Sequence, residues 1–234
     1  MQAVIPAAGR GTRLGALTAR RPKGLVPVDG RPLIEHALEA AIQLGADELV
    51  VVIGYRGAAI RDHLGGAYGG RPVRYVEQPN PVGLADAVAR AGAALEGDFV
   101  VVNADNVFSG ELGGLRDRLL TTADGALLVE TADAATARTT GVVDVADGRV
   151  VGVRERPDEP MSSLVTTGIY ALPLDAVHAC HLVTPSDRGE RELAAAIDLL
   201  CRAGYHVEAI RFEGVRVNVN TPTDLGRAAA ILSD

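Results

Sequence analysis

The first half of the chain alternates short apolar runs with longer segments of mixed polarity. Several of the short runs are apolar at consecutive positions and rich in valine, which is typical of strands covered on both faces. We therefore expect strands at Gln2 to Pro6, Leu49 to Tyr55, Val73 to Glu77, Phe99 to Asn103 and Ala126 to Glu130.

Between these strands, apolar residues recur at helical spacing. This pattern predicts helices at Leu33 to Gln43, Ala58 to Leu64, Leu84 to Leu95 and Leu112 to Leu120. A repeated strand–helix–strand order favours a mainly parallel sheet with right-handed crossovers. The predicted fold class is α/β, with a doubly wound, Rossmann-like sheet.

The second half of the chain has a different pattern. Two valine-rich runs flank Asp147-Gly148, which predicts an antiparallel hairpin with a tight turn. Further strands are expected at 165–173, 207–212 and 215–219, and an amphipathic helix at 189–204. We interpret the hairpin as a lobe inserted into one domain that spans residues 1–234.

A final helix is predicted from its start signals. Thr221 can cap it, Pro222 suits its first turn, and Asp224 stands at the capping-box position.

Composition narrows the function classes. The net charge of −7 over 234 residues argues against a general nucleic-acid binder, which normally carries a basic balance. No apolar run approaches the roughly 20 residues that span a bilayer, and no secretory signal is visible. We therefore expect a cytoplasmic protein that binds neither nucleic acid nor membrane.

The two cysteines do not indicate a disulfide framework or a metal centre. Cys180 and Cys201 are expected to be reduced in the cytoplasm. The segment His178 to His181 offers two histidines and a cysteine, but zinc needs four suitably spaced ligands and no second pair is apparent. A packed helix end is the better interpretation.

Glycines and cations gather directly after the first predicted strand, in the segment PAAGRGTRLGALTARRPKG. It lacks the G-K-[ST] of a Walker A loop, and its glycines give G-x-G-x-x-x-G rather than the dinucleotide-binding G-x-G-x-x-G. The small residues Ala7, Ala8, Gly9 and Gly11 would let backbone N–H groups approach phosphate oxygens, with Arg13 and Lys23 as cations. The alternative is a surface turn with solvated arginines.

This segment resembles the signature of sugar-1-phosphate nucleotidyltransferases, the NDP-sugar pyrophosphorylases. The resemblance continues in order through nearly the whole chain, in EQPNPVGLADAV, VVNADNVF, GVVDV…VVGVRERP, VTTGIYALP, PSDRGERELAAAIDLL and VRVNVNTPTDL. It implies a nucleotide-diphospho-sugar transferase fold, with a nucleotide-binding core at 1–130 and the sugar-binding part and closing elements at 131–234.

The resemblance also implies a reaction. A sugar 1-phosphate attacks the α-phosphorus of a nucleoside triphosphate and expels pyrophosphate, with charge neutralisation and alignment as the main catalytic effects. The segment at 81–87 is more similar to members that use dTTP or UTP, and glucose 1-phosphate is the default sugar among hexose 1-phosphates. A homo-oligomer is possible by analogy with relatives.

Site residues follow from the same resemblance. The catalytic cations would be Arg13 and Lys23. The nucleotide would contact Ala7, Ala8, Gly9, Gly11, Thr12, Gln78 and Gly83. The sugar phosphate would contact Gly141, Glu155, Arg156, Thr167 and Gly168. Mg²⁺ would be the cofactor, held by Asp105 and Asn218.

Asp105 also has an argument of its own. It follows the apolar run Phe99 to Val102, so it is expected at the carboxyl end of a buried parallel strand, where open α/β sheets place their sites. One carboxylate there suits Mg²⁺, which usually keeps water and phosphate ligands. A helix cap or turn is the alternative role for this residue.

Four positions depart from the family pattern. Asn218 stands where many relatives have Asp, Arg156 where Lys is usual, Thr140 where Tyr is common, and Ala104 where Gly usually precedes the Asp. These changes are either neutral or signs of a reshaped sugar pocket. The changes at 218, 140 and 156 also permit a non-catalytic nucleotide-sugar-binding regulatory protein. A nucleotidyltransferase that uses another base or a non-sugar alcohol phosphate stays open because it shares the G-x-G-T-R-like loop, although the segment at 155–157 and the hairpin argue against a non-sugar acceptor.

Overall fold

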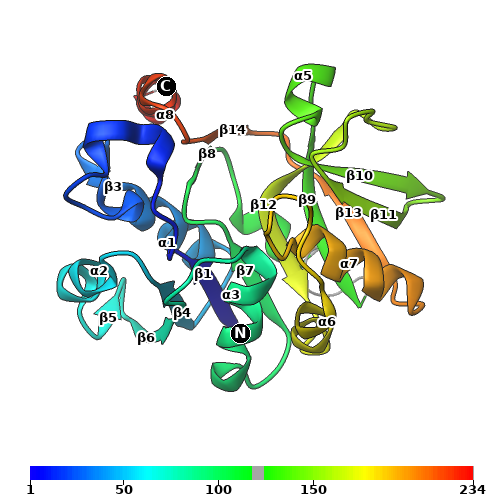
Figure 1. Cartoon of the computed structure of the whole chain (residues 1–234), viewed down its shortest axis with the longest axis horizontal. Coiled ribbons are helices and arrows are strands. Elements are labelled where there is room, and N and C mark those ends of the chain that lie inside the picture. Colours follow the sequence, from blue (N-terminus) through cyan, green and yellow to red (C-terminus); the bar gives the residue numbers. More distant parts are fainter. Residues whose placement is uncertain (118–123, 234) are drawn as a thin grey trace.

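One large twisted sheet forms the centre of the fold. The computed structural model describes residues 1–117 and 124–233, and among them ten strands form a sheet in the order β10-β11-β13-β9-β12-β7-β1-β4-β6-β5 (Figure 1). The sheet runs through both halves of the sequence, so the hairpin strands extend the same sheet as the first strand. The α/β class predicted from the sequence is confirmed, but the sheet is mixed rather than mainly parallel, because the strands from the second half of the sequence pair mostly antiparallel.

The parallel part lies on one side of this sheet. Strand β1 (Gln2–Pro6) runs parallel to β4 (Glu48–Ile53) and to β7 (Phe99–Val102), and β4 runs parallel to β6 (Arg71–Glu77). All of β7 and five of the six residues of β4 are buried, as expected for strands covered on both faces. The carboxyl ends of β1, β6 and β7 therefore meet along one edge.

The other part of the sheet is mostly antiparallel. Strand β12 (Leu164–Leu172) runs antiparallel to β7 and to β9 (Gly125–Thr131), whereas β13 (Val207–Arg211) runs parallel to β9. The predicted hairpin is formed by β10 (Gly141–Ala146) and β11 (Arg149–Glu155). Its turn residues Asp147 and Gly148 both have positive φ, of 50° and 77°, as a type I′ turn requires.

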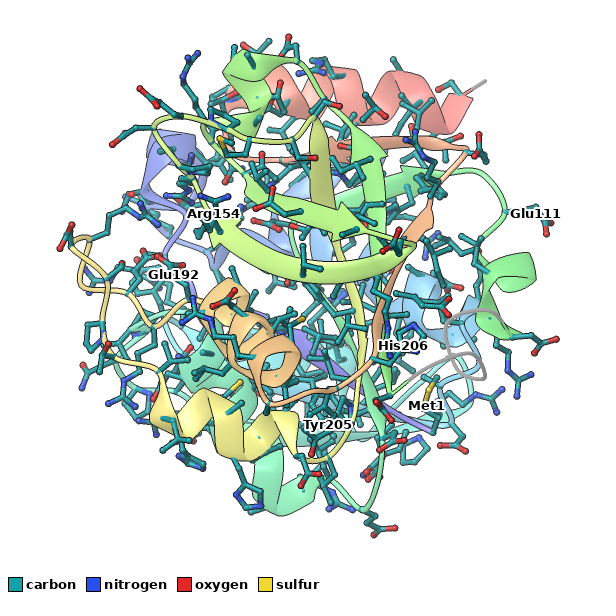
Figure 2. All side chains as sticks on the ribbon, turned by 90° about the vertical axis from the view of Figure 1, so that its right-hand side faces the viewer. Met1, Glu111, Arg154, Glu192, Tyr205 and His206 are labelled. Atoms are coloured by element: carbon teal, nitrogen blue, oxygen red, sulfur yellow. The ribbon has the colours of Figure 1, made fainter. Side chains whose placement is uncertain are left out.

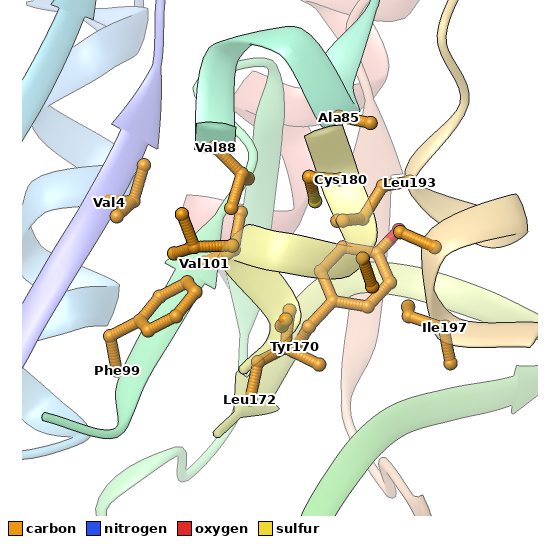
Figure 3. Packing of buried hydrophobic residues seen from close by; sticks show 14 of the residues in the cluster. Val4, Ala85, Val88, Phe99, Val101, Tyr170, Leu172, Cys180, Leu193 and Ile197 are labelled. Carbon is orange, nitrogen blue, oxygen red and sulfur yellow. The ribbon is translucent and has the colours of Figure 1, made fainter. Parts of the chain in front are cut away.

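Helices cover both faces of the sheet. One face packs against α1 (Leu33–Gln43) and α2 (Gly57–Leu64). The other packs against α3 (Leu84–Ala91), α6 (Ala176–Leu182) and α7 (Leu193–Arg202). Figure 3 shows this second core, where Val88 of α3 and Phe99 and Val101 of β7 face one another beside Cys180 of α6.

Helix ends differ slightly from the sequence prediction. The helix expected at 84–95 ends at Ala91 and continues as a short 3-10 turn, Gly92–Ala94. The predicted helix at 112–120 has a 3-10 turn at Gly113–Leu115, and its last three residues lie outside the described residues. Gly204, with φ of 95°, ends α7 as the sequence predicted.

A small second sheet joins the chain terminus to the middle of the sequence. Strand β8 (Asn106–Ser109) was not predicted, and it pairs antiparallel with β14 (Val215–Asn218). Helix α8 (Pro222–Ser233) follows β14 and packs beside β8 and the short strand β2 (Pro27–Val28) (Figure 1). Asn218 and the start of α8 thereby lie next to the segment that follows β7.

The other short elements are the strands β3 (Arg31–Pro32) and β5 (Ala67–Tyr68), the helix α5 (Ala134–Ala137), and the 3-10 turns Thr12–Leu17 and Lys23–Leu25. Within the described part of the chain, every helix is too short or too polar to cross a membrane.

Candidate active site

Two adjoining cavities open at the edge where the parallel strands end. The first, which we call the loop cavity, has a volume of about 450 Å³ and lies against the glycine-rich segment. The second, the hairpin cavity, has a volume of about 170 Å³ and lies against β10, β11 and β12. The two share part of their lining: Arg13, Leu84, Asn103, Asp105, Glu190 and Asn220.

The glycine-rich loop contains backbone N–H groups that donate to no other group in the described part of the chain. Of the hydrogen bonds in the described part of the chain, none takes the backbone N–H of Gly9, Arg10 or Gly11. All three residues line the loop cavity, with Ala7, Ala8 and Thr12. Unpaired N–H groups at the end of a strand are suited to anionic oxygens.

Lys23 is directed into the loop cavity by close packing. A Cβ on Gly11 (φ 64°) would lie 2.8 Å from Cβ of Lys23, so the lysine stem packs against a position that only glycine can fill. Lys23 Nζ donates to Asp105 Oδ2 at 2.8 Å. The side chains of Lys23 and Asp105 are 14% and 30% exposed, so the pair is open to a ligand only from the cavity side.

Asn220 is a site residue that the sequence analysis did not single out. Its Oδ1 accepts from Arg13 Nη2 at 2.8 Å and from Lys23 Nζ at 3.1 Å, while its Nδ2 donates to Asn218 Oδ1 at 2.7 Å. One amide thus links both predicted catalytic cations to a predicted metal ligand. The spacing of Asn218 and Asn220 was a usable signal, because alternate residues of an extended chain share a side.

The start of α8 holds Asn220 in place. Asp224 Oδ2 accepts from the backbone N–H of Asn220 at 3.0 Å and of Thr221 at 2.8 Å. The hydroxyl of Thr221 also donates to it, at 2.8 Å. The predicted role of Asp224 in capping is confirmed, although Thr221 acts as a donor to Asp224 rather than as an acceptor of helical N–H groups.

Asp105 and Asn218 both line the hairpin cavity, and Val219 N donates to the backbone oxygen of Asp105 at 2.8 Å. The two side chains offer a carboxylate and an amide oxygen, the donor types that Mg²⁺ prefers. Three clustered His, Cys, Asp or Glu side chains do not occur among the described residues, so a metal here would complete its shell with ligand and water oxygens. The residues therefore fit a hard cation bound jointly with a phosphate.

Glu155 and Arg156 lie at the end of β11, on the wall of the hairpin cavity. Arg156 Nε lies 3.1 Å from Glu155 Oε1. A Cβ on Gly141 would lie 3.2 Å from Glu155 Oε2, so this glycine leaves room for the carboxylate. Burial raises the pKa of Glu155, and the negative charge of Glu192 raises it further, while Arg156 opposes both.

Figure 2 views this side of the molecule, where β11 passes over α7 and Glu192 lies on the loop that precedes α7. An ionised Glu155 at this buried position lowers the stability of the fold unless a ligand donates hydrogen bonds to its carboxylate.

Replacing Glu155 with Gln is expected to change how thermal stability depends on pH. Because the pKa of Glu155 is raised in the folded state, wild-type stability falls as pH rises from the ordinary value of 4.5 through the raised value. The Gln variant escapes that loss, so its Tm advantage should grow over this interval and then level off. Thermal unfolding against pH measures this. The exposed Glu111, changed to Gln, is the control and should show no such trend.

Two predicted residues have different surroundings from those expected. Thr167 is fully buried and donates through Oγ1 to Leu128 O at 2.9 Å, so it does not line either cavity; its neighbour Thr166 lines the hairpin cavity. Gly83 lines the loop cavity, but a Cβ there would lie 2.3 Å from the backbone oxygen of Arg191. The close approach that requires this glycine is to the protein's own backbone.

Two polar atoms beside Gly168 are buried without a protein partner in the described part of the chain: Asn103 Oδ1 and Asn106 Nδ2. Asn106 Oδ1 accepts from Arg216 Nη1 at 2.9 Å, which fixes the orientation of that amide. A Cβ on Gly168 (φ 88°) would lie 2.3 Å from Asn106 Nδ2, so the glycine makes room for this amide beside the backbone of β12. Buried polar atoms of this kind are usually satisfied by ordered water.

The profile of the nucleotidyl transferase family matches residues 2–233. The chain belongs to this family. The family resemblance seen in the sequence is thereby confirmed, and the cavities described above are the candidate active site of a nucleotidyltransferase.

Family members with curated names include a UTP–glucose-1-phosphate uridylyltransferase from Haloferax volcanii, 43% identical over all of this chain and 97% of the relative. A glucose-1-phosphate thymidylyltransferase from Streptomyces antibioticus is 33% identical over 96% of this chain and 64% of its own length. Among solved structures, one of a putative glucose-1-phosphate thymidylyltransferase from Bacillus anthracis, with a sucrose, superposes with a TM-score of 0.88 at 25% identity, covering 100% of this chain and 96% of that one.

Proposed function

We propose that this protein transfers a nucleotidyl group from UTP or dTTP to a hexose 1-phosphate, with glucose 1-phosphate as the first candidate. The observation that carries the proposal is the contact between Lys23, which lines the loop cavity, and Asp105, which lines both cavities at their junction. A triphosphate in the loop cavity and a sugar phosphate in the hairpin cavity would meet at that junction.

The loop cavity suits the triphosphate. The free N–H groups of Gly9 to Gly11 would bind phosphate oxygens, and Arg13 would lie near the leaving pyrophosphate. Lys23 would contact the α-phosphate, where charge changes most during displacement. Mg²⁺ held by Asp105 and Asn218 would neutralise charge on the phosphates and help align them.

The hairpin cavity suits a sugar. Glu155 can accept from hydroxyl groups, and Arg156 can pair with the sugar phosphate. The relative that is 43% identical carries a name that specifies UTP and glucose 1-phosphate, which favours this pair of substrates for this chain.

The test follows pyrophosphate release when the purified protein is incubated with each of UTP, dTTP, CTP, ATP and GTP and a panel of sugar 1-phosphates. We expect the fastest release with UTP or dTTP and glucose 1-phosphate. No release with any pair, although binding of nucleotide is detected, would favour the non-catalytic alternative. Faster turnover of a purine triphosphate would overturn the assignment of the base.

A further inference from the structure

The side-chain amide of Gln78 has a fixed orientation. Gln78 directly follows β6, is only 2% exposed and lines the loop cavity. Its Nε2 donates to Gly83 O at 3.1 Å and to Asp86 Oδ2 at 2.8 Å. A backbone carbonyl and an ionised carboxylate accept hydrogen bonds but do not donate them. The NH₂ group of Gln78 must therefore face both partners, and the amide has one orientation.

Asp86 accepts the hydrogen bond from Gln78 as an ionised carboxylate. It lies in the first turn of α3, is 8% exposed, and its Oδ2 also accepts from Arg90 Nε at 2.7 Å. Burial alone would raise the pKa of Asp86, but the hydrogen bonds from Arg90 and Gln78 hold it below its ordinary value. The group is therefore an ionised carboxylate at neutral pH, with no proton to donate.

Both N–H bonds of Gln78 are thus used within the protein, and its Oε1 is the atom of the amide left to meet a ligand. Uracil and thymine carry an N–H at ring position 3, whereas cytosine has a lone pair there. An acceptor suits the first two bases and faces an unpaired lone pair in the third.

We propose that Asp86 is a positioning residue that makes Gln78 a hydrogen-bond acceptor in the loop cavity, and so selects uracil or thymine over cytosine. This inference rests on the proposed function. It assigns the choice between pyrimidines to a carboxylate that acts through Gln78 rather than on the base itself.

The experiment compares kcat/KM for UTP and for CTP, with glucose 1-phosphate as acceptor. In wild type the UTP/CTP ratio should be at least about 100. Asp86→Leu has a similar shape but no acceptor, so the amide of Gln78 keeps only its longer bond to Gly83 O, at 3.1 Å, and the ratio should fall at least about tenfold as the amide turns more easily. Asp86→Ala is a second variant without an acceptor, used if the leucine side chain prevents folding, as judged by thermal unfolding.

Asp86→Asn is the matched control. Arg90 Nε can only donate, so it holds the oxygen of the new amide where Oδ2 now lies, and that oxygen still accepts from Gln78. The UTP/CTP ratio should then stay within about threefold of wild type, because the acceptor and not the charge sets the orientation.

Three results would count against the inference. An unchanged ratio in folded Asp86→Leu and Asp86→Ala overturns it, because Gln78 would then need no help from Asp86. An equal fall in Asp86→Asn also overturns it, because charge or general packing would explain the change. A wild-type protein that turns over neither UTP nor CTP overturns both this inference and the proposed function, whereas the first two results leave the proposed function intact.

Discussion

Replacing Lys23 with Met should lower kcat about 1000-fold, in the upper part of the range seen when one preorganised donor is removed from a site where charge develops. The methionine keeps an unbranched stem against Gly11, so the loop should keep its shape. What is lost is the ammonium group that lies 2.8 Å from Asp105 Oδ2. Steady-state kinetics with UTP and glucose 1-phosphate would measure the effect, and KM for UTP should change much less than kcat.

Arg21 provides the control for this substitution. It belongs to the same basic segment, but its side chain is exposed and does not line either cavity. Arg21→Met should keep kcat within about threefold of wild type, since it removes the same charge away from the reacting groups. A similar fall in both variants would mean that the segment acts through its overall charge, and the role assigned to Lys23 would be wrong.

The strands of the parallel part were predictable because burial on both faces leaves a direct trace in the sequence. Strands β1, β4 and β7 each come from an apolar run, and the Asp147-Gly148 turn indicates the hairpin. The sequence of strand β8 contains no comparable apolar run. Its only described partner is β14, more than 100 residues away, so its extended form depends on tertiary pairing rather than on local pattern.

Some site residues could likewise be predicted from a local sequence pattern, and others could not. The glycine-rich segment could be found because its small residues and cations are contiguous. Thr167 was predicted together with Gly168, although adjacent residues of a strand face opposite sides and cannot both line one cavity. The structure gives that side of β12 to Thr166, Gly168 and Tyr170.

Asn220 shows what sequence alone leaves out. Its contacts join residues 13, 23, 218 and 220, and only the fold brings these together. A local pattern can suggest that a polar side chain faces a site, but it does not show which cation that side chain holds.

Asp105→Asn should abolish most of the activity, with kcat/KM lower by about 1000-fold at low Mg²⁺. The amide preserves the size of the side chain and one oxygen, but removes the charge that pairs with Lys23 and would bind the metal. Because an amide oxygen is a weaker ligand for Mg²⁺, raising the Mg²⁺ concentration should recover part of the lost rate. Activity as a function of Mg²⁺ measures the shift of the midpoint to higher concentration.

Asp62, on the exposed side of α2, is the matched control, and Asp62→Asn should leave both the rate and its Mg²⁺ midpoint unchanged. The two variants test different parts of the argument. A slow Asp105→Asn enzyme with an unchanged midpoint would show that this carboxylate serves to hold Lys23 and does not bind Mg²⁺. Full activity at low Mg²⁺ would remove Asp105 from the site altogether, and with it the reason for placing the reaction at the junction of the two cavities.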